Sequence, residues 1–433
     1  MAACDPCVIN ASSKSPSSPP SCSGTRSSSC RFTSFVARVR WPRTEISIHQ
    51  SSLLDVSTLK IKMISYLFLG NVRGFEFIKP NQLLGGAEIT LYDLSQYLLR
   101  RGHDVTVVQE WNENEVFEFH GVRIIGLKLP FGVKHPLQLN LFWKKALEED
   151  DDRVHFHQYI NAFPFGSSSM TGTCHGVAWD CPHIPAYRRK ALVFINNFLV
   201  KRLKKIASCD SYLLRYVQSE FPDLRSKIEV IPNYVKTEIF NPQNDGGEIR
   251  SRFDGRQLIL FPRNLTFGRG IHTAIDAVAL LVSKFPDVVL LIVGDGPCKA
   301  WLQARVAQLR LQRNVVLEGH KEHFTAMPKY YAAADIVIIP SFCSEGTSLA
   351  CLEAMATGKP VVVTNVGGLQ DLVIDSFNGL VAKPTAASLA AKIELLLNDN
   401  QLRRRISGEA HNWVKNRHSF ESWSKAYENF LEL

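Results

Sequence analysis

The feature that most constrains the fold is a series of short apolar runs that alternate with amphipathic segments. In the second half of the chain these runs are Leu258–Phe261, Val288–Val293, Val315–Leu317, Ile336–Ile339 and Pro360–Thr364. Most of them end in a turn that contains glycine or polar residues, and a helical pattern follows. Strands and helices that alternate at this spacing predict an α/β fold built on a parallel sheet.

The first half of the chain follows the same pattern. Met63–Leu69 is predicted to be a strand, and Gly85 and Gly86 stand in the loop after it, before a helical pattern and a second strand, Asp104–Val108. Glycines in this place let the backbone approach a ligand at the carboxyl end of a strand. A simple need for loop flexibility is the competing explanation.

The length of the chain predicts more than one domain. A chain of 433 residues is too long for one hydrophobic core, and a polar stretch, Asn241–Gly247, separates its two halves. We therefore predict α/β domains over residues 63–245 and 246–415. The tail, residues 416–433, is rich in aromatic residues, and we expect it to form a helix that packs back on the N-terminal domain.

Residues 1–62 differ in composition from the rest. The first sixty residues hold fifteen serines, seven Lys or Arg and three acidic residues, without apolar periodicity. Such a segment cannot bury a core, so we expect it to be disordered. Its composition is also that of a transit peptide for a plastid or another organelle, and a leader without function is an equally weighted alternative.

Composition and charge exclude some classes of protein. The chain is 45% hydrophobic and 21% charged, as a soluble globular protein is, and no apolar run approaches the ~20 residues that span a bilayer. A net charge of +9 suits phosphorylated ligands or an anionic membrane surface and does not indicate nucleic acid. Ten cysteines without paired spacing predict a reducing compartment and no disulfide framework. We therefore expect a cytoplasmic protein, soluble or peripheral.

The segment from Pro340 to Gly368 carries the strongest candidate site. The strand Ile336–Ile339 precedes a loop that holds Glu345, and a helix that begins near Ser348 contains Glu353. The free amides at a helix N-terminus favour an anion such as a diphosphate. Carboxylates beside a phosphate are unfavourable unless they bind neutral hydroxyls, such as those of a sugar. The layout therefore predicts a site for a sugar nucleotide.

Two arginines form a second candidate element. Arg263 and Arg269 stand six residues apart around a glycine turn, directly after the predicted strand Leu258–Phe261. Open α/β sheets bind ligands at the carboxyl ends of their strands. Two guanidinium groups in that position are suited to hold a diphosphate through charge-assisted hydrogen bonds.

Two other groups of residues could suggest a metal ion. Histidines and cysteines gather near two predicted strand ends at His155, His157, His175, Cys181 and His183. Their spacing fits no common zinc pattern, so no metal site is predicted there. Asp150–Asp152 contains the D-x-D of metal-dependent sugar transferases, but a solvated helix end explains it better.

Residues 188–206 form a helical pattern that contains no acidic residue. Lys190, Lys201 and Lys204 fall on one face, and apolar residues fall on the other. A basic amphipathic face of this kind could contact anionic lipid. The solvent face of a helix packed on the sheet is the favoured interpretation.

Taken together, the motifs resemble those of the retaining glycosyltransferases of family 4. Their fold, GT-B, consists of two Rossmann-like domains that face a central cleft, and the resemblance covers about residues 63–433. Two glutamates eight positions apart are weak evidence alone, because chance supplies roughly one such pair in a chain of this length. The ordered series is specific, and comprises Gly85-Gly86, Thr173–Gly176, Pro232-Asn233, Arg263 with a basic residue six positions later, Gly294–Pro297, Pro340-Ser341, Glu345 with Glu353, and Gly367-Gly368.

The resemblance implies a role for each matching residue. Glu353 would bind the ribose hydroxyls of a donor, Glu345 would contact hydroxyls of the transferred hexose, and His175 would lie near that sugar. Arg263 would stabilise the leaving diphosphate, and Arg269 stands where the family usually has lysine. The implied donor-binding residues are Gly85, Gly86, Arg263, Arg269, Glu345, Gly346, Thr347, Ser348 and Glu353, and the implied catalytic residues are His175, Arg263, Arg269 and Glu345.

The resemblance also implies the reaction. A hexosyl group would pass from a nucleotide sugar to a glycan, lipid or small-molecule acceptor, with retention and without a metal ion or other cofactor. A UDP-sugar is favoured by its frequency in the family, with GDP and ADP open. A catalytically silent protein of the same fold, which binds nucleotide sugars or glycans, is the alternative that the intact glutamates and arginines disfavour.

Overall fold

The computed structural model describes residues 58–65, 69, 85–128, 146–147, 151–177, 179–181, 184–343 and 345–433. Most of the predicted extension, residues 1–57, lies outside the described residues. Asp150 and His183, which entered the weighing of metal sites, lie outside them as well.

The first sheet has eight strands in the order β3-β4-β2-β1-β5-β6-β7-β8. Neighbouring strands are parallel except for the antiparallel pair β3 and β4 at one edge. The first strand begins at Lys60, earlier than the predicted start at Met63. The bounds are β1 Lys60–Ile64, β2 Asp104–Trp111, β3 Glu115–Phe119, β4 Val122–Lys128, β5 Arg153–Phe156, β6 Met170–Cys174, β7 Lys205–Ser208 and β8 Ile228–Val230.

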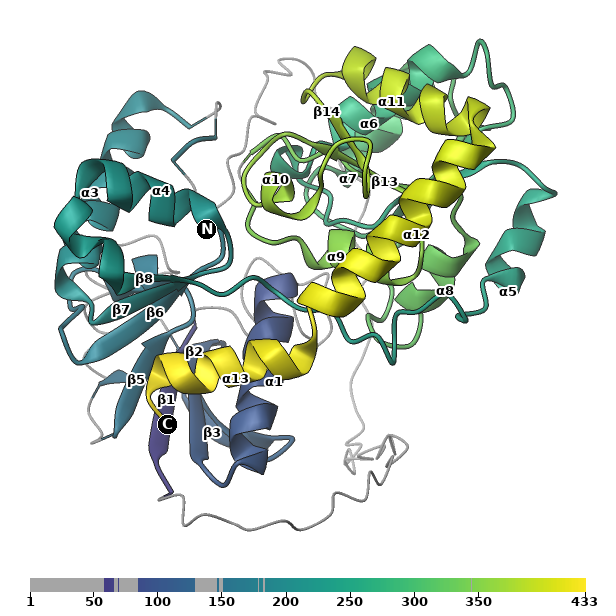
Figure 1. Cartoon of the computed structure of the whole chain (residues 1–433). Coiled ribbons are helices and arrows are strands. Elements are labelled where there is room, and N and C mark those ends of the chain that lie inside the picture. The colour runs from purple at the N-terminus through teal and green to yellow at the C-terminus, as the bar shows by residue number, and fades with distance from the viewer. Residues whose placement is uncertain are drawn as a thin grey trace, which may run out of the picture. The chain divides into compact units, whose positions relative to one another are not determined.

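Helices cover both faces of this sheet (Figure 1). Met63 and Val107 point to one face, where they pack with α1 (Gly86–Arg100) and α13 (Phe420–Leu431). Ile64 and Val108, the next residue in each strand, point to the other face. That face packs on α3 (Ala186–Arg202) and α4 (Ser211–Glu220). This alternation is the two-residue period of a strand that is buried on both sides.

The second sheet has six parallel strands in the order β11-β10-β9-β12-β13-β14. Every residue of the four central strands is buried, which explains why their sequences are uninterrupted apolar runs. The bounds are β9 Leu258–Phe261, β10 Val289–Val293, β11 Val315–Gly319, β12 Ile336–Ile339, β13 Val361–Thr364 and β14 Leu380–Ala382.

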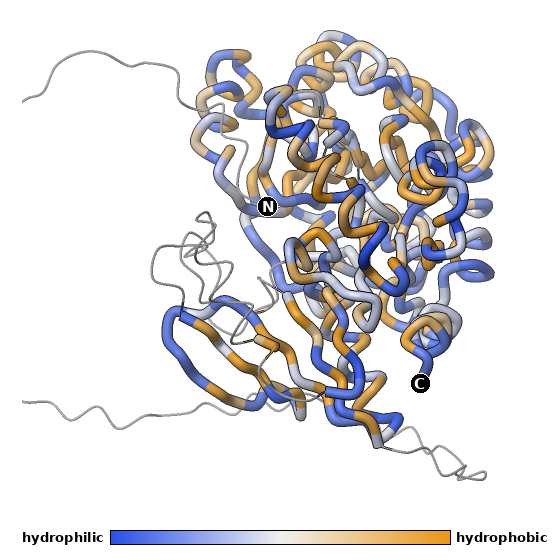
Figure 2. Tube along the Cα trace, turned by 90° about the vertical axis from the view of Figure 1, so that its left-hand side faces the viewer, coloured by the Kyte–Doolittle hydropathy of each residue, from blue (hydrophilic) through white to orange (hydrophobic). Residues whose placement is uncertain are grey.

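Helices also cover both faces of the second sheet. Leu258 and Leu260 pack with α8, α9 and the end of α12, whereas Ile259 and Phe261 pack with α6, α7 and α11. In Figure 2 the helices alternate between hydrophilic and hydrophobic residues along their length, as this packing requires. The bounds are α5 Gly247–Arg250, α6 Ile271–Leu281, α7 Lys299–Gln308, α8 Met327–Ala333, α9 Leu349–Ala356, α10 Leu369–Leu372, α11 Ala386–Asn398 and α12 Asn400–Arg417. The predicted α/β class with two Rossmann-like sheets is confirmed, whereas the exact domain limits stay a prediction.

The last two helices connect the two sheets. α12 ends at Arg417, and Ser419 caps α13 by accepting a hydrogen bond from the backbone of Ser422. α13 then lies beside α1, where Trp423 and Phe430 join the core of the first sheet (Figure 1).

Three further predictions differ from the structure. The helix predicted over 188–206 ends at Arg202, because Lys205–Ser208 forms the strand β7 and pairs with β6. Ile206 is apolar and fits both a helix face and a strand, so the sequence did not distinguish them. A disulfide joins Cys181 to Cys343, although no disulfide was predicted; their separation of 162 residues hides the pairing in the sequence. Asp151 is not solvated but forms a buried ion pair with Lys62 at 2.5 Å.

Candidate functional site

The centre of the candidate site is a cluster of Arg263, Arg269 and Glu345. β9 and β12 are neighbours, so the loops after their carboxyl ends meet. Nη2 of Arg263 lies 2.5 Å from Oε1 of Glu345, and Nη1 of Arg269 lies 3.2 Å from Oε2. Arg263 also donates a hydrogen bond to the Ser348 hydroxyl at 2.9 Å. The structure thus brings both predicted arginines to the predicted acidic loop.

The ionisation of Glu345 is fixed by its neighbours. Burial alone would raise the pKa of this carboxyl, but the charges of Arg263 and Arg269 outweigh it and lower the pKa to about 2. The Ser341 hydroxyl donates a further hydrogen bond to the carboxylate. Two arginines against one carboxylate leave the cluster with a net positive charge, which suits an anionic ligand.

The cluster borders the N-terminus of α9. Ser348 is the N-cap residue, and its side chain does not bond the amides of the first turn. The loop before it is fixed from the other sheet, because Asn233 donates to the Thr347 carbonyl at 2.7 Å and the Thr347 hydroxyl donates to the Cys209 carbonyl. A side chain at Gly346 would lie 2.8 Å from the carbonyl oxygen of His175, so only glycine fits there. The amides of residues 346–348 are therefore held at the site by close backbone packing.

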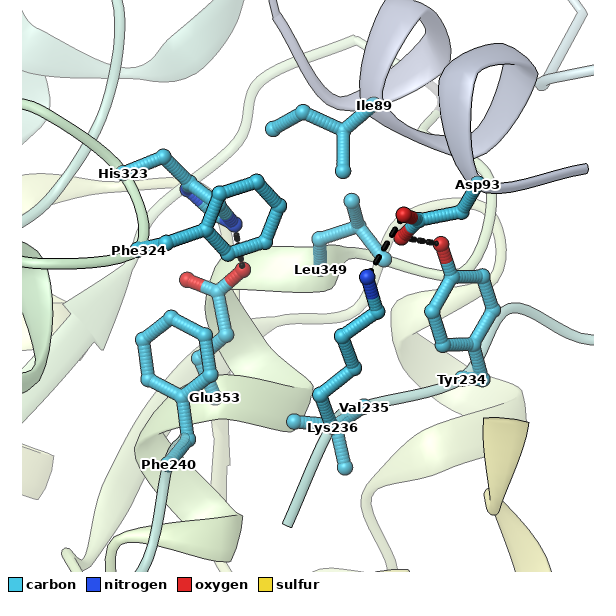
Figure 3. A pocket seen from close by; sticks show the side chains of 10 residues that line it. All are labelled: Ile89, Asp93, Tyr234, Val235, Lys236, Phe240, His323, Phe324, Leu349 and Glu353. Atoms are coloured by element: carbon cyan, nitrogen blue, oxygen red, sulfur yellow. Dashed lines mark hydrogen bonds and ion pairs between the residues drawn. The ribbon is translucent and has the colours of Figure 1, made fainter. Parts of the chain in front are cut away.

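Glu353 lies further along α9 and lines a pocket (Figure 3), which Arg263, Arg269 and Glu345 do not line. Its Oε2 accepts a hydrogen bond from the Tyr331 hydroxyl at 2.7 Å, and its Oε1 lies 3.4 Å from Nε2 of His323. These contacts orient the carboxylate within the pocket lining. The pocket is lined by Ile89, Asp93, Tyr234, Val235, Lys236, Phe240, His323, Phe324, Leu349 and Glu353.

The opposite wall of this pocket is formed by α1 and the segment after β8. Asp93 of α1 is buried and forms an ion pair with Lys236 at 2.5 Å, and it accepts a hydrogen bond from the Tyr234 hydroxyl. Both contacts are drawn in Figure 3. They fix α1 to the chain that leads into the second sheet.

Gly85 and Gly86 bring the start of α1 next to α9. A side chain on Gly86 would lie 3.3 Å from Cδ1 of Leu349, so the glycine permits close approach of the two helices. Gly85 is the N-cap residue of α1 in an extended conformation. The structure therefore places Gly86 of the predicted pair against the helix that carries Glu353.

His175 follows β6 and packs on His157, with 4.4 Å between the ring centroids. Burial lowers the pKa of His175 to about 4, partly offset by a hydrogen bond with the backbone of His157. The pKa of His157 is likewise lowered by burial, and its Nε2 lies 2.6 Å from the carbonyl oxygen of Ala87. Both rings are therefore neutral at physiological pH, and His157 donates to Ala87 in the first turn of α1, next to the glycine pair.

Sequence reasoning missed several residues of the site. Glu88 lies in the first turn of α1, and burial raises its pKa to about 7 although the charge of Arg269 opposes this. Its place two residues after Gly86 was a usable signal. Tyr331 and His323, which contact Glu353, carried no signal, because the chain folds them there from distant positions.

The residues weighed for a metal ion have other partners. His155 lies between the hydroxyls of Thr171 and Thr173, at 2.9 and 3.0 Å. Asp152 accepts a hydrogen bond from the backbone of Lys60. Within the described residues no group of three His, Cys, Asp or Glu side chains could hold a metal ion. In the same part of the chain no helix is long and apolar enough to cross a bilayer.

Two family models match most of the described chain. The model "Glycosyl transferases group 1" matches residues 248–413, and the model "Glycosyltransferase Family 4" matches residues 84–239. An uncharacterised glycosyltransferase of Methanocaldococcus jannaschii is 26% identical over 82% of this chain and 96% of its own. A glycogen synthase of Mycobacterium tuberculosis is 26% identical over 74% of this chain and 84% of its own.

Solved structures share the fold. Sucrose-phosphate synthase of Thermosynechococcus elongatus superposes with a TM-score of 0.71 at 20% identity, over 86% of this chain and 98% of its own. The Anabaena protein HepE, solved with UDP-glucose, superposes with a TM-score of 0.68 at 19% identity, over 86% of this chain and 99% of its own. The predicted architecture of two Rossmann-like domains is confirmed by these likenesses.

Proposed function

The chain belongs to the glycosyltransferases of group 1, and on that basis we propose that it transfers a hexosyl group from a nucleotide sugar to an acceptor hydroxyl. We further propose that transfer retains the anomeric configuration and uses no metal ion. The observation that carries this proposal is the cluster of Arg263, Arg269 and Glu345 at the N-terminus of α9.

The two arginines fit the charge that develops during the reaction. As the bond between the sugar and the diphosphate breaks, negative charge grows on the diphosphate oxygens and positive charge grows on the sugar ring. Arg263, Arg269 and the amides of residues 346–348 would stabilise the diphosphate, and the ionised Glu345 lies beside them. The guanidinium groups would supply the charge that a divalent cation supplies elsewhere.

The remaining residues would bind the neutral parts of the donor. Glu353 lines its pocket and would accept hydrogen bonds from ribose hydroxyls. Nε2 of His175 is buried without a hydrogen-bond partner among the described residues, and the ring is neutral. It would bind a hydroxyl of the hexose, together with Glu345. Gly85 and Gly86 would let the backbone of α1 face the phosphates.

Retention would follow from attack on the same face from which the diphosphate leaves. In that arrangement the departing phosphate oxygen accepts the proton of the acceptor hydroxyl. The acceptor oxygen then forms its bond to the sugar carbon, so no separate general base is needed. Residues of both sheets at the site would exclude water and so protect the donor from hydrolysis.

A UDP-sugar is the favoured donor, and GDP- and ADP-sugars are the alternatives. HepE, which shares the fold, was solved with UDP-glucose, and this supports UDP. The acceptor would be a glycan, a lipid or a small molecule, and the relative named glycogen synthase supports a glycan. A protein that binds nucleotide sugars without turnover is the second candidate, and it is disfavoured by the intact acidic and basic residues.

The proposal is tested by incubating the full chain with UDP-, GDP- and ADP-glucose in the presence of EDTA. Proton NMR would follow the consumption of each donor and the anomeric configuration of the first product. We expect transfer, or slow hydrolysis, of one donor with retention. A requirement for added metal or an inverted product would overturn the proposed mechanism, and donor binding without turnover would favour the silent protein.

A further inference from the structure

The disulfide between Cys181 and Cys343 joins the two halves of the chain beside the candidate site. Cys181 lies in the segment after β6, which begins with His175, and Trp179 of this segment packs into the core of the first sheet. Cys343 lies in the loop after β12, two residues before Glu345. The bridge therefore connects the segment of His175 to the loop of Glu345, and the proposed reaction makes no use of it.

Cys343 also contacts the loop that carries the two arginines. Its backbone amide donates a hydrogen bond to the Gly268 carbonyl at 3.3 Å, and the amide of Phe342 donates to the same oxygen at 2.9 Å. A Cβ atom at Gly268 would lie 3.5 Å from Sγ of Cys343. Gly268 directly precedes Arg269. Breaking or forming the bridge therefore acts on the acidic loop and on the arginine loop together.

The bridged chain leaves little room for a nucleotide sugar. The pocket that Glu353 lines has a volume of about 250 Å³. Pockets that bind small molecules and cofactors measure ~300–1,000 Å³. The lining includes Ile89 of α1 and Leu349 of α9, one from each half of the chain. A donor therefore needs the two halves to separate before it enters, and a covalent bond between them opposes this separation.

The other described cysteines are poorly suited to thiol exchange. Cys174, Cys209, Cys298 and Cys351 are free and buried. Burial raises the pKa of the Cys174, Cys209 and Cys351 thiols, which keeps them protonated and unreactive. Cys343 is partly exposed, so a dissolved thiol has access to it. In proteins that keep their other thiols reduced, a disulfide is usually catalytic or redox-sensing.

We propose that Cys181 and Cys343 form a redox lock on the candidate site, which is closed as the disulfide and opened by a dithiol reductant. One thiolate of the reductant attacks Sγ of Cys343, and the S–S bond breaks with Cys181 leaving as a thiolate. The second thiolate of the reductant attacks its own first sulfur in the mixed disulfide and releases Cys343. The reductant becomes an internal disulfide, and the two cysteines gain two electrons and two protons.

Peptide mapping of the full chain tests the exchange itself. The folded chain is equilibrated with reduced or oxidised dithiothreitol, free thiols are blocked with N-ethylmaleimide, and a non-reduced digest is analysed by mass spectrometry. We expect a peptide that joins Cys181 to Cys343 after oxidation, its loss after reduction, and its return on reoxidation. No such peptide after oxidation would overturn the proposal, as would one that persists in the folded chain under excess reductant.

Hydrogen exchange measures whether reduction opens the site. The backbone amides of residues 345–348 should exchange faster in the reduced chain than in the oxidised chain, because the bridge no longer holds their loop against the first sheet. Cys181→Ser and Cys343→Ser each remove the bridge and should exchange as the reduced chain does under both conditions. Cys298→Ala removes a buried thiol from a core of the second sheet and should keep the redox response. Equal exchange in the oxidised and reduced chains would overturn the lock.

The effect on turnover rests on the proposed glycosyl transfer. An apparent dissociation constant rises as the open fraction falls, so a bridge that holds this fraction below ~10% should slow turnover at low donor about tenfold or more. UDP-, GDP- and ADP-glucose are the donors used. Equal turnover by the oxidised and reduced chains, or a redox response in the serine variants, would overturn the lock. A reduced chain that exchanges faster but turns over no donor would overturn the glycosyl transfer and leave the lock supported.

Discussion

At the scale of single residues, burial and neighbouring charges fix the ionisation of the site. Glu345 has a pKa near 2 and stays ionised, whereas His175 has a pKa near 4 and stays neutral. The stability that Glu345 contributes is present above pH ~4.3 and is lost as pH falls through about 2. Between pH 5 and 8 neither group changes its charge. Glu88, whose pKa is about 7, is the group of the site that titrates there.

Glu88→Gln should change how stability depends on pH. The folded chain raises the pKa of Glu88 from about 4.3 to about 7, so it favours the protonated form. The stability contributed by this group is present below pH ~4.3 and is lost as pH rises through 7. The variant should differ little from the unchanged chain at pH 4 and exceed it by on the order of 3 kcal/mol at pH 8, measured by urea unfolding. If the variant and the unchanged chain differed in stability by the same amount at both pH values, the raised pKa of Glu88 would be contradicted. Glu118→Gln, at an exposed position, is the control.

Glu353→Ala should weaken donor binding. The carboxylate accepts a hydrogen bond from Tyr331 and lines the pocket, and a hydrogen bond to a charged group contributes about 1.5–3 kcal/mol. We expect the dissociation constant for the nucleoside diphosphate to rise about 10- to 100-fold, measured by titration calorimetry. If the variant kept its melting temperature and its affinity for the nucleoside diphosphate, Glu353 would not bind the ribose hydroxyls.

His157 should act by positioning the first turn of α1, next to the glycine pair. A glutamine amide can replace the Nε2 donor to the Ala87 carbonyl, and a phenylalanine ring cannot. We expect His157→Phe to lower kcat/KM for the donor about tenfold and His157→Gln to retain most of it. If the residue only fills space, the phenylalanine variant should be the more active of the two, and steady-state rates decide between these outcomes.

At the scale of helices and strands, the sequence predicted best those elements whose pattern of apolar residues alone identifies them. β9, β10, β12 and β13 are buried on both faces, so their apolar runs marked them directly. The end of α3 was mistaken because Ile206 suits both a helix face and a strand. Arg263, Arg269, Glu345 and Glu353 stand in local motifs and could be proposed from the sequence, whereas Glu88 was missed. The contact of Tyr331 with Glu353 was not, because tertiary packing alone brings these side chains together.

α13 should contribute strongly to stability. Phe430 is buried in the core of the first sheet with Trp423 and Tyr427. Replacing a buried phenylalanine by alanine removes its contacts and leaves a cavity, at a cost of about 3–5 kcal/mol. Phe430→Ala should lower the free energy of unfolding by that amount, whereas Lys425→Ala on the exposed face should change it little. Equal effects of the two variants would show that α13 does not pack as described.

At the scale of the whole chain, the loops of the site join the two sheets. Asn233 bonds Thr347, and Asp371 accepts hydrogen bonds from the backbone and hydroxyl of Ser211 at 2.8 and 2.7 Å. The Asp371 carboxylate thus bonds the first residue of α4 from the other half of the chain. Because these contacts join residues that are far apart in the sequence, no single segment of the chain contains the whole site.

The central claim is that Arg263, beside Arg269 at the start of α9, stabilises the leaving diphosphate. The most direct test is the rate of donor cleavage by Arg263→Gln at saturating donor, in EDTA, with the melting temperature as a check on folding. Loss of a group that stabilises developing charge lowers kcat by about 10²–10³, so we predict a loss of that size. An unchanged kcat in the folded variant would contradict the claim.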